Sequence, residues 1–151
     1  MWRNPAYRRA RVELNKKAKG DLAELKVAAD LRARGYRIAI PYGEDWDFDL
    51  ILCRDDGAFE RVQVKYVRSD GCVIEIRSRS HSLTNGKVRC TKRYTAAMID
   101  WLAVWDAVLD RCFYVPAVEL GAGMHLLTLR LSPTRNGQVR GTRPAERYTT
   151  I

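Results

Sequence analysis

The apolar residues near the start of the chain follow a helical repeat. Between Leu22 and Arg34 they fall mainly on one face, with charged residues opposite: Leu22, Leu25, Ala28, Ala29 and Leu31. This spacing predicts a helix over Leu22–Arg34. Gly35 follows directly and is typical of a helix end. The segment before it, residues 1–20, is expected to be a basic arm that is helical in part, with Asn4-Pro5 as a helix start.

After Gly35 the pattern becomes typical of strands. We predict short strands over Tyr36–Ile40, Phe48–Cys53 and Glu60–Val67. Asp56-Gly57 lies between the last two and favours a tight turn, so these strands are expected to form a hairpin. In the returning strand, alternation places two sets of side chains on opposite faces, namely Val62, Val64 and Tyr66 against Arg61, Gln63 and Lys65.

The second half of the chain has a less regular pattern. Further strands are predicted over 72–78, 112–118 and 125–131. Residues 81–93 are polar and basic, and we expect a loop there, with a turn at Asn85-Gly86. The apolar spacing of 94–110 suits either a helix or a buried strand. The polar residues after Ser132 predict a loop or arm.

The length and charge narrow the class of protein. At 151 residues the chain is expected to form a single domain over residues 1–151, with a basic arm at 1–18 and a basic tail at 132–151. The net charge of +9 favours a polyanion as partner over a membrane surface. The residues expected to contact nucleic acid are Lys16, Lys17, Lys19, Arg77, Arg79, Lys87, Arg89, Lys92 and Arg93.

Cysteine spacing and hydropathy point to an intracellular protein. None of the four cysteines forms a Cys-x-x-Cys pair, so a zinc or disulfide framework is not expected. No apolar stretch approaches the roughly 20 residues that span a bilayer, and no membrane partner is expected. We therefore expect a cytoplasmic, nucleoid-associated protein.

The predicted hairpin brings together residues that suit metal-assisted hydrolysis. Asp49 opens one strand, while Gln63 and Lys65 share a face of the other. Glu24, on the preceding helix, is placed to complete the cluster. Mg²⁺ prefers oxygen ligands, and a lysine beside the attacking water supplies positive charge. Asp45 and Asp47 are alternative carboxylates, but Asp49 directly precedes the apolar strand residues.

These motifs resemble the PD-(D/E)XK nuclease superfamily. The resemblance is carried by Lys19-Gly20-Asp21-Leu22-Ala23-Glu24, Asp49-Leu50-Ile51 and Val62-Gln63-Val64-Lys65, and it extends more weakly to residues 99–104, 113–116 and 146–148. Within the superfamily the chain looks most like the homing endonucleases associated with group I introns, and more distantly like archaeal Holliday junction resolvases. The resemblance implies an α/β fold with a restriction-endonuclease-like core (αβββαβ-type): a mixed central sheet and a flanking N-terminal helix. It also implies a strand pair after Asp100.

The resemblance also implies roles for the site residues. Mg²⁺, with Mn²⁺ as a substitute, would be held by Asp49, Gln63, the Val64 carbonyl and Glu24, and Lys65 would orient or activate the attacking water. The superfamily's second acid is replaced by Gln63, a form that the intron-associated group tolerates. The implied substrate is double-stranded or branched DNA. Two alternatives stay open: a resolvase of branched DNA, and a non-catalytic DNA-binding module with a decayed site.

The motif set occurs once, so one chain is expected to cut one strand at a time. Matching cuts in antiparallel strands then require a homodimer, or the homotetramer implied by the intron-associated relatives. The aromatic-rich segments 101–105 and 113–118 are predicted to supply surplus apolar surface for that interface. Trp46, Trp101 and Trp105 are expected in a core or an interface.

Overall fold

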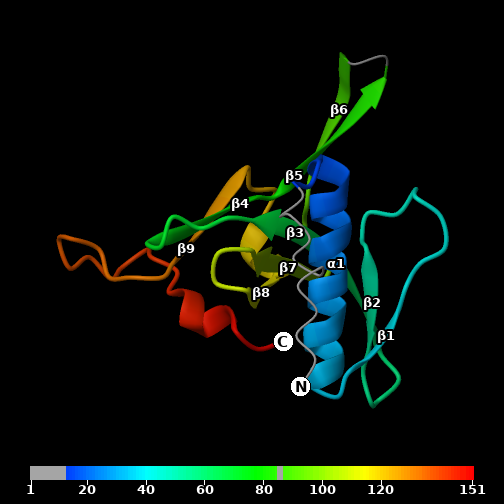
Figure 1. Ribbon diagram of the computed structural model, residues 1–151, viewed down its shortest axis with the longest axis horizontal. Coiled ribbons are helices and arrows are strands. Elements are labelled where there is room, and N and C mark those ends of the chain that lie inside the picture. The colour runs from blue at the N-terminus through cyan, green and yellow to red at the C-terminus, as the bar shows by residue number, and fades with distance from the viewer. Residues whose placement is uncertain (1–12, 85–86) are drawn as a thin grey trace, which may run out of the picture.

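A computed structural model describes residues 13–84 and 87–151 (Figure 1). Its elements, in chain order, are α1 (Lys16–Ala33), β1 (Arg37–Ala39), β2 (Leu50–Cys53), β3 (Phe59–Val67), β4 (Val73–Arg77), β5 (Arg79–Thr84), β6 (Lys87–Arg93), β7 (Trp101–Asp106), β8 (Arg111–Pro116), η2 (Ala117–Leu120), β9 (Leu126–Arg130) and η3 (Ala145–Tyr148). Most of the elements expected from the sequence pattern are thus present, in an α/β arrangement.

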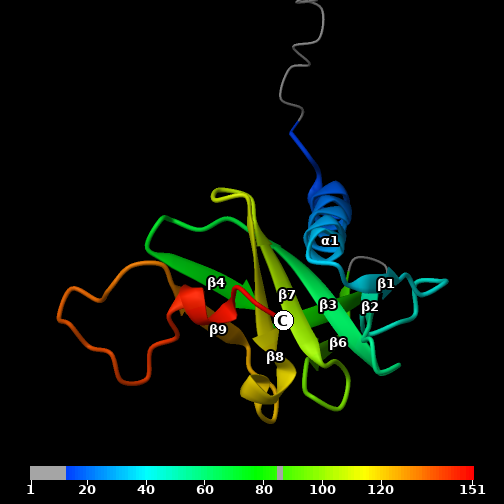
Figure 2. The same cartoon turned by 90° about the horizontal axis from the view of Figure 1, so that it is seen from below.

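The central sheet has five strands in the order β1-β2-β3-β7-β8. The β3–β7 pair is parallel, and the β1–β2, β2–β3 and β7–β8 pairs are antiparallel. Figure 2 shows α1 on one side of this sheet and β4 and β9 on the other. The predicted mixed sheet with a flanking N-terminal helix is therefore confirmed. The strand interpretation of 101–106 is also confirmed, because β7 is a central strand.

Two apolar clusters hold these layers together. On one face, Ala23, Val27 and Leu31 recur every four residues along α1 and pack on the sheet through Leu50, Leu52, Val62 and Val64. On the other face, the β4–β9 ribbon packs on β7 and β8, through Ile74, Ile76, Leu127 and Leu129. Successive residues of β3 therefore point alternately toward α1 and toward the opposite face, as the hairpin prediction requires.

The helix begins earlier than its apolar pattern indicated. Asn15 caps α1, and its side chain accepts a hydrogen bond from the Ala18 N–H at 2.9 Å. The expected start at Leu22 is wrong because the first turn is polar and projects beyond the sheet. Gly35 ends the helix in the left-handed region, at φ +89°. The expected helix start at Asn4-Pro5 lies outside the described residues.

The loop expected over 81–93 is wrong. Residues 79–84 and 87–93 form the antiparallel ribbon β5–β6, which Figure 1 shows extending away from the body of the protein. A ribbon without a neighbouring layer buries little surface, so its sequence carries no apolar alternation. The turn expected at Asn85-Gly86 lies outside the described residues.

The tail expected to be a loop or arm is partly structured. It ends in the short helix η3, whose Ala145 and Tyr148 are buried in the same cluster as β4 and β9. Arg34 Nη1 also donates to the Thr149 carbonyl at 2.7 Å, which ties the last residues to α1. Within the described ranges, none of the helices has the length and apolar character of a membrane span.

Candidate active site

The end of the β2–β3 pairing places Asp49. Its N–H donates to the Val62 carbonyl at 2.9 Å, and β2 begins one residue later, at Leu50. Because Leu50 is buried under α1, the Asp49 side chain points to the other face of the sheet. There, Asp49 Oδ2 accepts a hydrogen bond from the Val64 N–H at 2.8 Å. Burial raises the pKa of this carboxyl, although the Val64 N–H and Lys65 both oppose the shift.

Gln63 joins Asp49 to the next carbonyl along β3. Its Nε2 donates to Asp49 Oδ2 at 2.6 Å and to the Val64 carbonyl oxygen at 3.2 Å. The side chain is buried, with 7% of its surface exposed. A carboxylate oxygen and a main-chain oxygen therefore face one point, which the amide nitrogen occupies.

Lys65 lies two residues beyond Gln63 on the same face of β3. Its ammonium is 4.9 Å from the centroid of the Tyr94 ring. Burial lowers the pKa of Lys65, Asp49 opposes this shift, and Lys16 adds to it. Lys65 and Asp49 are thus close enough for each charge to stabilise the charged form of the other.

Glu24 approaches this group from α1 without joining its hydrogen bonds. Burial raises the pKa of the half-buried Glu24, and the charges of Asp49 and Asp21 raise it further. Its side chain lines a separate hollow beside Ile40 and Leu50. Among residues 13–84 and 87–151, no three His, Cys, Asp or Glu side chains gather into a metal-binding group.

A cavity of about 530 Å³ opens in front of Asp49 and Gln63. Its other walls come from the loop before β2 and from the base of the β5–β6 ribbon: Glu44, Asp45, Trp46, Asp47, Ser80, Lys92 and Tyr94. The cavity therefore lies between the hairpin that carries Asp49 and Gln63, the loop before β2 and the base of the β5–β6 ribbon.

Comparison with known proteins identifies the family. The sequence model of the PD-(D/E)XK endonucleases matches residues 14–151. The chain belongs to the PD-(D/E)XK endonuclease family. The structure of a bacterial homing endonuclease, I-Ssp6803I, is similar, with a TM-score of 0.69, 19% sequence identity, and coverage of 89% of this chain and 88% of that chain. At this identity the likeness shows the shared fold. None of the curated proteins compared with the chain matches it.

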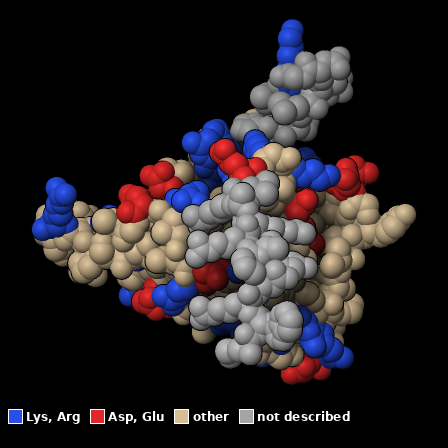
Figure 3. Space-filling view, in the orientation of Figure 1, with Lys and Arg blue, Asp and Glu red and all other residues tan. Residues whose placement is uncertain are grey.

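The basic residues expected to contact nucleic acid lie on several elements of this endonuclease, and of these residues Lys92 lines the cavity. Lys16, Lys17 and Lys19 lie in the first turn of α1, whereas Arg79 and Arg93 are opposite each other at the base of the ribbon. Figure 3 shows Lys and Arg side chains where α1 begins and the ribbon leaves the body, with acidic side chains among them. Arg77 is exposed at the end of β4 and Lys87 on β6, and the side chain of Arg89 lies outside the described part.

Two acidic loop residues behave differently from Asp49. Lys92 Nζ is 3.0 Å from Asp47 Oδ1, so this carboxylate binds the ribbon, and Asp45 is exposed. Neither takes part in the hydrogen bonds among Asp49, Gln63 and Val64. Of these three carboxylates, Asp49 is the one that hydrogen-bonds to Gln63 and Val64.

Sequence reasoning missed Tyr94, which lines the cavity and faces Lys65. No periodic pattern marks it, because its approach depends on how the β5–β6 ribbon folds back to the sheet. Trp46, which was expected in a core or an interface, lies outside the core and is 54% exposed beside the cavity. Trp105 is buried within the chain.

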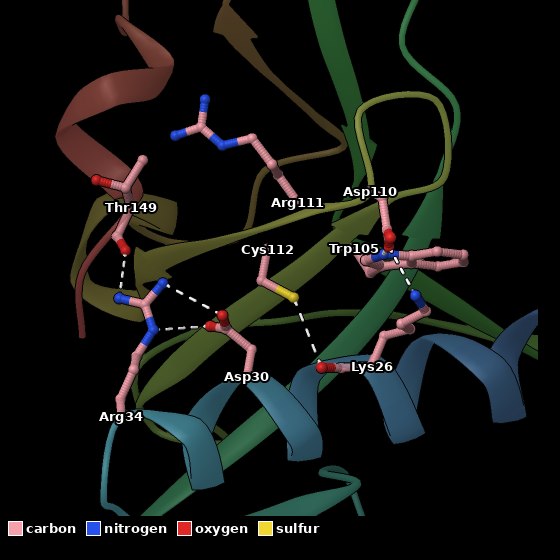
Figure 4. A pocket seen from close by; sticks show the side chains of 8 residues that line it. All are labelled: Lys26, Asp30, Arg34, Trp105, Asp110, Arg111, Cys112 and Thr149. Carbon is pink, nitrogen blue, oxygen red and sulfur yellow. Dashed lines mark hydrogen bonds and ion pairs between the residues drawn. The ribbon is translucent and has the colours of Figure 1, made fainter.

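A second cavity, of about 310 Å³, lies between α1 and β8 (Figure 4). Its cations are already paired: Lys26 with Asp110 at 2.8 Å, and Arg34 with Asp30 at 2.9 Å. Burial raises the pKa of the Cys112 thiol to about 12, so it is a poor nucleophile at neutral pH. Arg111, the third cation lining this cavity, pairs with Glu146 at 3.3 Å.

Proposed function

We propose that this endonuclease hydrolyses DNA with a divalent cation, in the manner of a homing endonuclease. The observation that carries the proposal is the convergence of Asp49 Oδ2 and the Val64 carbonyl on a single point beside Gln63. The donor set consists of oxygens, which suits Mg²⁺, with Mn²⁺ as a substitute. A rotated Gln63 amide would add its own oxygen, and Glu24 would contribute directly or through water.

Each residue of the site would have a separate role in hydrolysis. A bound divalent cation would polarise the phosphate and its attacking water. Asp49 and the Val64 carbonyl would hold the cation, because both oxygens face the same point. The Lys65 ammonium would orient the attacking water and offset the negative charge that develops on the phosphate. The partial burial of this group strengthens each of these electrostatic contributions.

The direct test is cleavage of several DNA forms. Purified protein is incubated with supercoiled, linear and four-way-junction DNA, in Mg²⁺ and in EDTA, and the products are separated on gels. We expect Mg²⁺-dependent cleavage of supercoiled or linear DNA. Cleavage restricted to the junction would assign a resolvase instead, and binding without any cleavage would indicate a DNA-binding module with a decayed site.

We predict that Gln63→Glu retains partial activity and binds metal more tightly. In EDTA, the new carboxylate cannot donate to Asp49 Oδ2 or to the Val64 carbonyl, and it adds charge beside Asp49. Unpaired buried groups cost about 1–3 kcal/mol each. The metal-free variant should therefore melt several degrees below the wild type. Added Mg²⁺ should raise the melting temperature of the variant more than that of the wild type.

Gln63→Ala is the matched control, because it removes the amide without adding a ligand. It should show the smallest Mg²⁺-dependent change in melting temperature of the three proteins. A Gln63→Glu variant that melts like the wild type in EDTA, and responds no better to Mg²⁺, would contradict the assigned donor set.

DNA affinity is expected to fall steeply with salt. Arg79 and Arg93 are opposite each other in the ribbon register, and like charges in that position repel unless an anion lies between them. Each phosphate contact contributes about 0.9 to the slope of log affinity against log salt concentration. Arg93→Gln should therefore lower the slope by about one, measured by fluorescence anisotropy in EDTA.

Arg111→Gln is the control for charge alone, since Arg111 pairs with Glu146 near the second cavity. It removes the same charge from another part of the surface and should leave the slope nearly unchanged. Equal slopes for the wild type and Arg93→Gln would remove the ribbon base from the DNA interface.

We also predict that the active enzyme is at least a homodimer, and of the two assemblies we favour a homotetramer. Each chain carries one site, whereas a duplex has two antiparallel strands to cut, so two chains related by a two-fold axis are needed. The expected surplus of apolar surface is wrong, because Trp105, Phe113, Tyr114 and Val115 are all buried within the chain. Light scattering at micromolar concentration tests the prediction, and double-strand cleavage by a monomer would contradict it.

A further inference from the structure

The ammonium of Lys65 is held in an unusual way. Within residues 13–84 and 87–151 this ammonium makes no hydrogen bond or ion pair. Its Nζ lies over the ring of Tyr94, 4.9 Å from the ring centroid. An ammonium within about 6 Å of a ring centroid is attracted by the negative face of the aromatic system. The ring is therefore the contact that fixes where this charge lies.

Tyr94 is itself firmly placed. Its N–H donates to the Ser78 carbonyl at 3.2 Å, directly after β6 ends, and its hydroxyl is hydrogen-bonded to the Ser80 side chain. Only 4% of the residue is exposed, and its ring packs in the cluster shared with β4 and β9. Rigid support of this kind is what a positioning group requires.

A tyrosine buried in this way is often part of the core and nothing more. Two observations separate Tyr94 from that case. It lines the same cavity as Asp49 and Gln63, and its ring is turned toward a cation rather than only toward apolar side chains. Tyr148 provides the contrast: it is 6% exposed in the same cluster, and its hydroxyl donates to Glu119 at 2.7 Å, far along the chain from this cavity.

We infer that Tyr94, which lines the active-site cavity, is a positioning residue whose ring holds the Lys65 ammonium in place. The inference rests on the proposed catalytic role of Lys65. Small displacements of a catalytic group reduce the rate of the chemical step much more than the affinity for substrate. Removing the ring should therefore affect turnover and leave DNA binding nearly intact.

The test compares Tyr94→Phe, which keeps the ring, with Tyr94→Leu, which removes it. Tyr148→Leu is the matched control for lost core packing. Single-turnover cleavage is measured at saturating DNA and Mg²⁺, with the dissociation constant and melting temperature of each variant. We expect Tyr94→Phe to cleave within about threefold of the wild type, and Tyr94→Leu to be slower by roughly ten- to a hundredfold, at similar affinity. Tyr148→Leu should lose stability without losing rate.

A spectroscopic measurement covers the case in which Tyr94→Leu does not fold. In protein labelled with ¹³C-lysine, the ε-methylene signal of Lys65 should be shifted upfield by the ring, and Lys65→Arg assigns it. The shift should persist in Tyr94→Phe. An unshifted signal in the wild type, or wild-type cleavage by Tyr94→Leu, would overturn the inference. If Lys65→Ala cleaves as well as the wild type, the proposed catalytic role of Lys65 fails instead.

Discussion

Lys65→Ala is expected to reduce cleavage to background while DNA binding survives. The ammonium lies on the same strand face as Gln63, two residues away, and its partial burial strengthens its interaction with nearby charges. Removing a group that acts on the transition state lowers turnover by on the order of 10²–10³-fold or more. A single partly buried charge contributes much less to the affinity for a long polyanion.

The measurement separates these two effects. Single-turnover rates report the chemical step, and anisotropy in EDTA reports binding without cleavage. Lys26→Ala is the control, because it removes a lysine that pairs with Asp110 beside the second cavity. It should cleave like the wild type. Near-wild-type cleavage by Lys65→Ala would remove this lysine from the mechanism.

Local alternation was sufficient to predict the hairpin that carries the site. The turn at Gly57, at φ +89°, joins β2 to β3, and the register pairs Leu50 with Val62. Once these are paired, a period of two forces Asp49, Gln63 and Lys65 onto one face. The arrangement therefore follows from a short stretch of sequence, without knowledge of the rest of the fold.

The ribbon and the second layer were not predictable in the same way. Strands that extend into solvent have no apolar face to alternate, so residues 79–93 look like a loop. The covering of β7 and β8 by β4, β9 and η3 depends on contacts between distant segments. Without that layer, aromatic residues such as Phe113 look like an interface, although the chain buries them itself.

The position of Glu24 shows a further limit of pattern reasoning. The helical repeat places it near the sheet edge, but the distance to the other ligands depends on how α1 crosses β3. The structure brings its charge close enough for Asp49 to raise its pKa, but leaves it outside the hydrogen bonds around Gln63. Its role in holding a cation therefore remains a proposal that rests on the family resemblance.

Asp49→Asn is expected to abolish cleavage with both Mg²⁺ and Mn²⁺, because it removes the charged ligand of the site. Asp47→Asn should be much milder. Asp47 pairs with Lys92 at the rim, and such exposed pairs contribute about 0–1 kcal/mol. Cleavage is measured across a range of concentrations of both metals. If Asp47→Asn loses cleavage activity and Asp49→Asn keeps it, the wrong carboxylate was assigned as the metal ligand.

Asp49→Asn should be at least as stable as the wild type when metal is absent. Burial raises the pKa of Asp49, so the folded protein favours the neutral carboxyl. The resulting stability is fully present below the ordinary carboxyl pKa and is lost as pH rises through the raised value. At neutral pH the wild type therefore holds an unfavourable ionised group, which asparagine does not. Melting curves in EDTA should show this gain in stability of Asp49→Asn at pH 7 and a smaller gain at acidic pH.

Added Mg²⁺ should stabilise only the wild type, since a ligand stabilises the state that binds it. A variant that is less stable in EDTA, yet still responds to Mg²⁺, would place the metal away from Asp49.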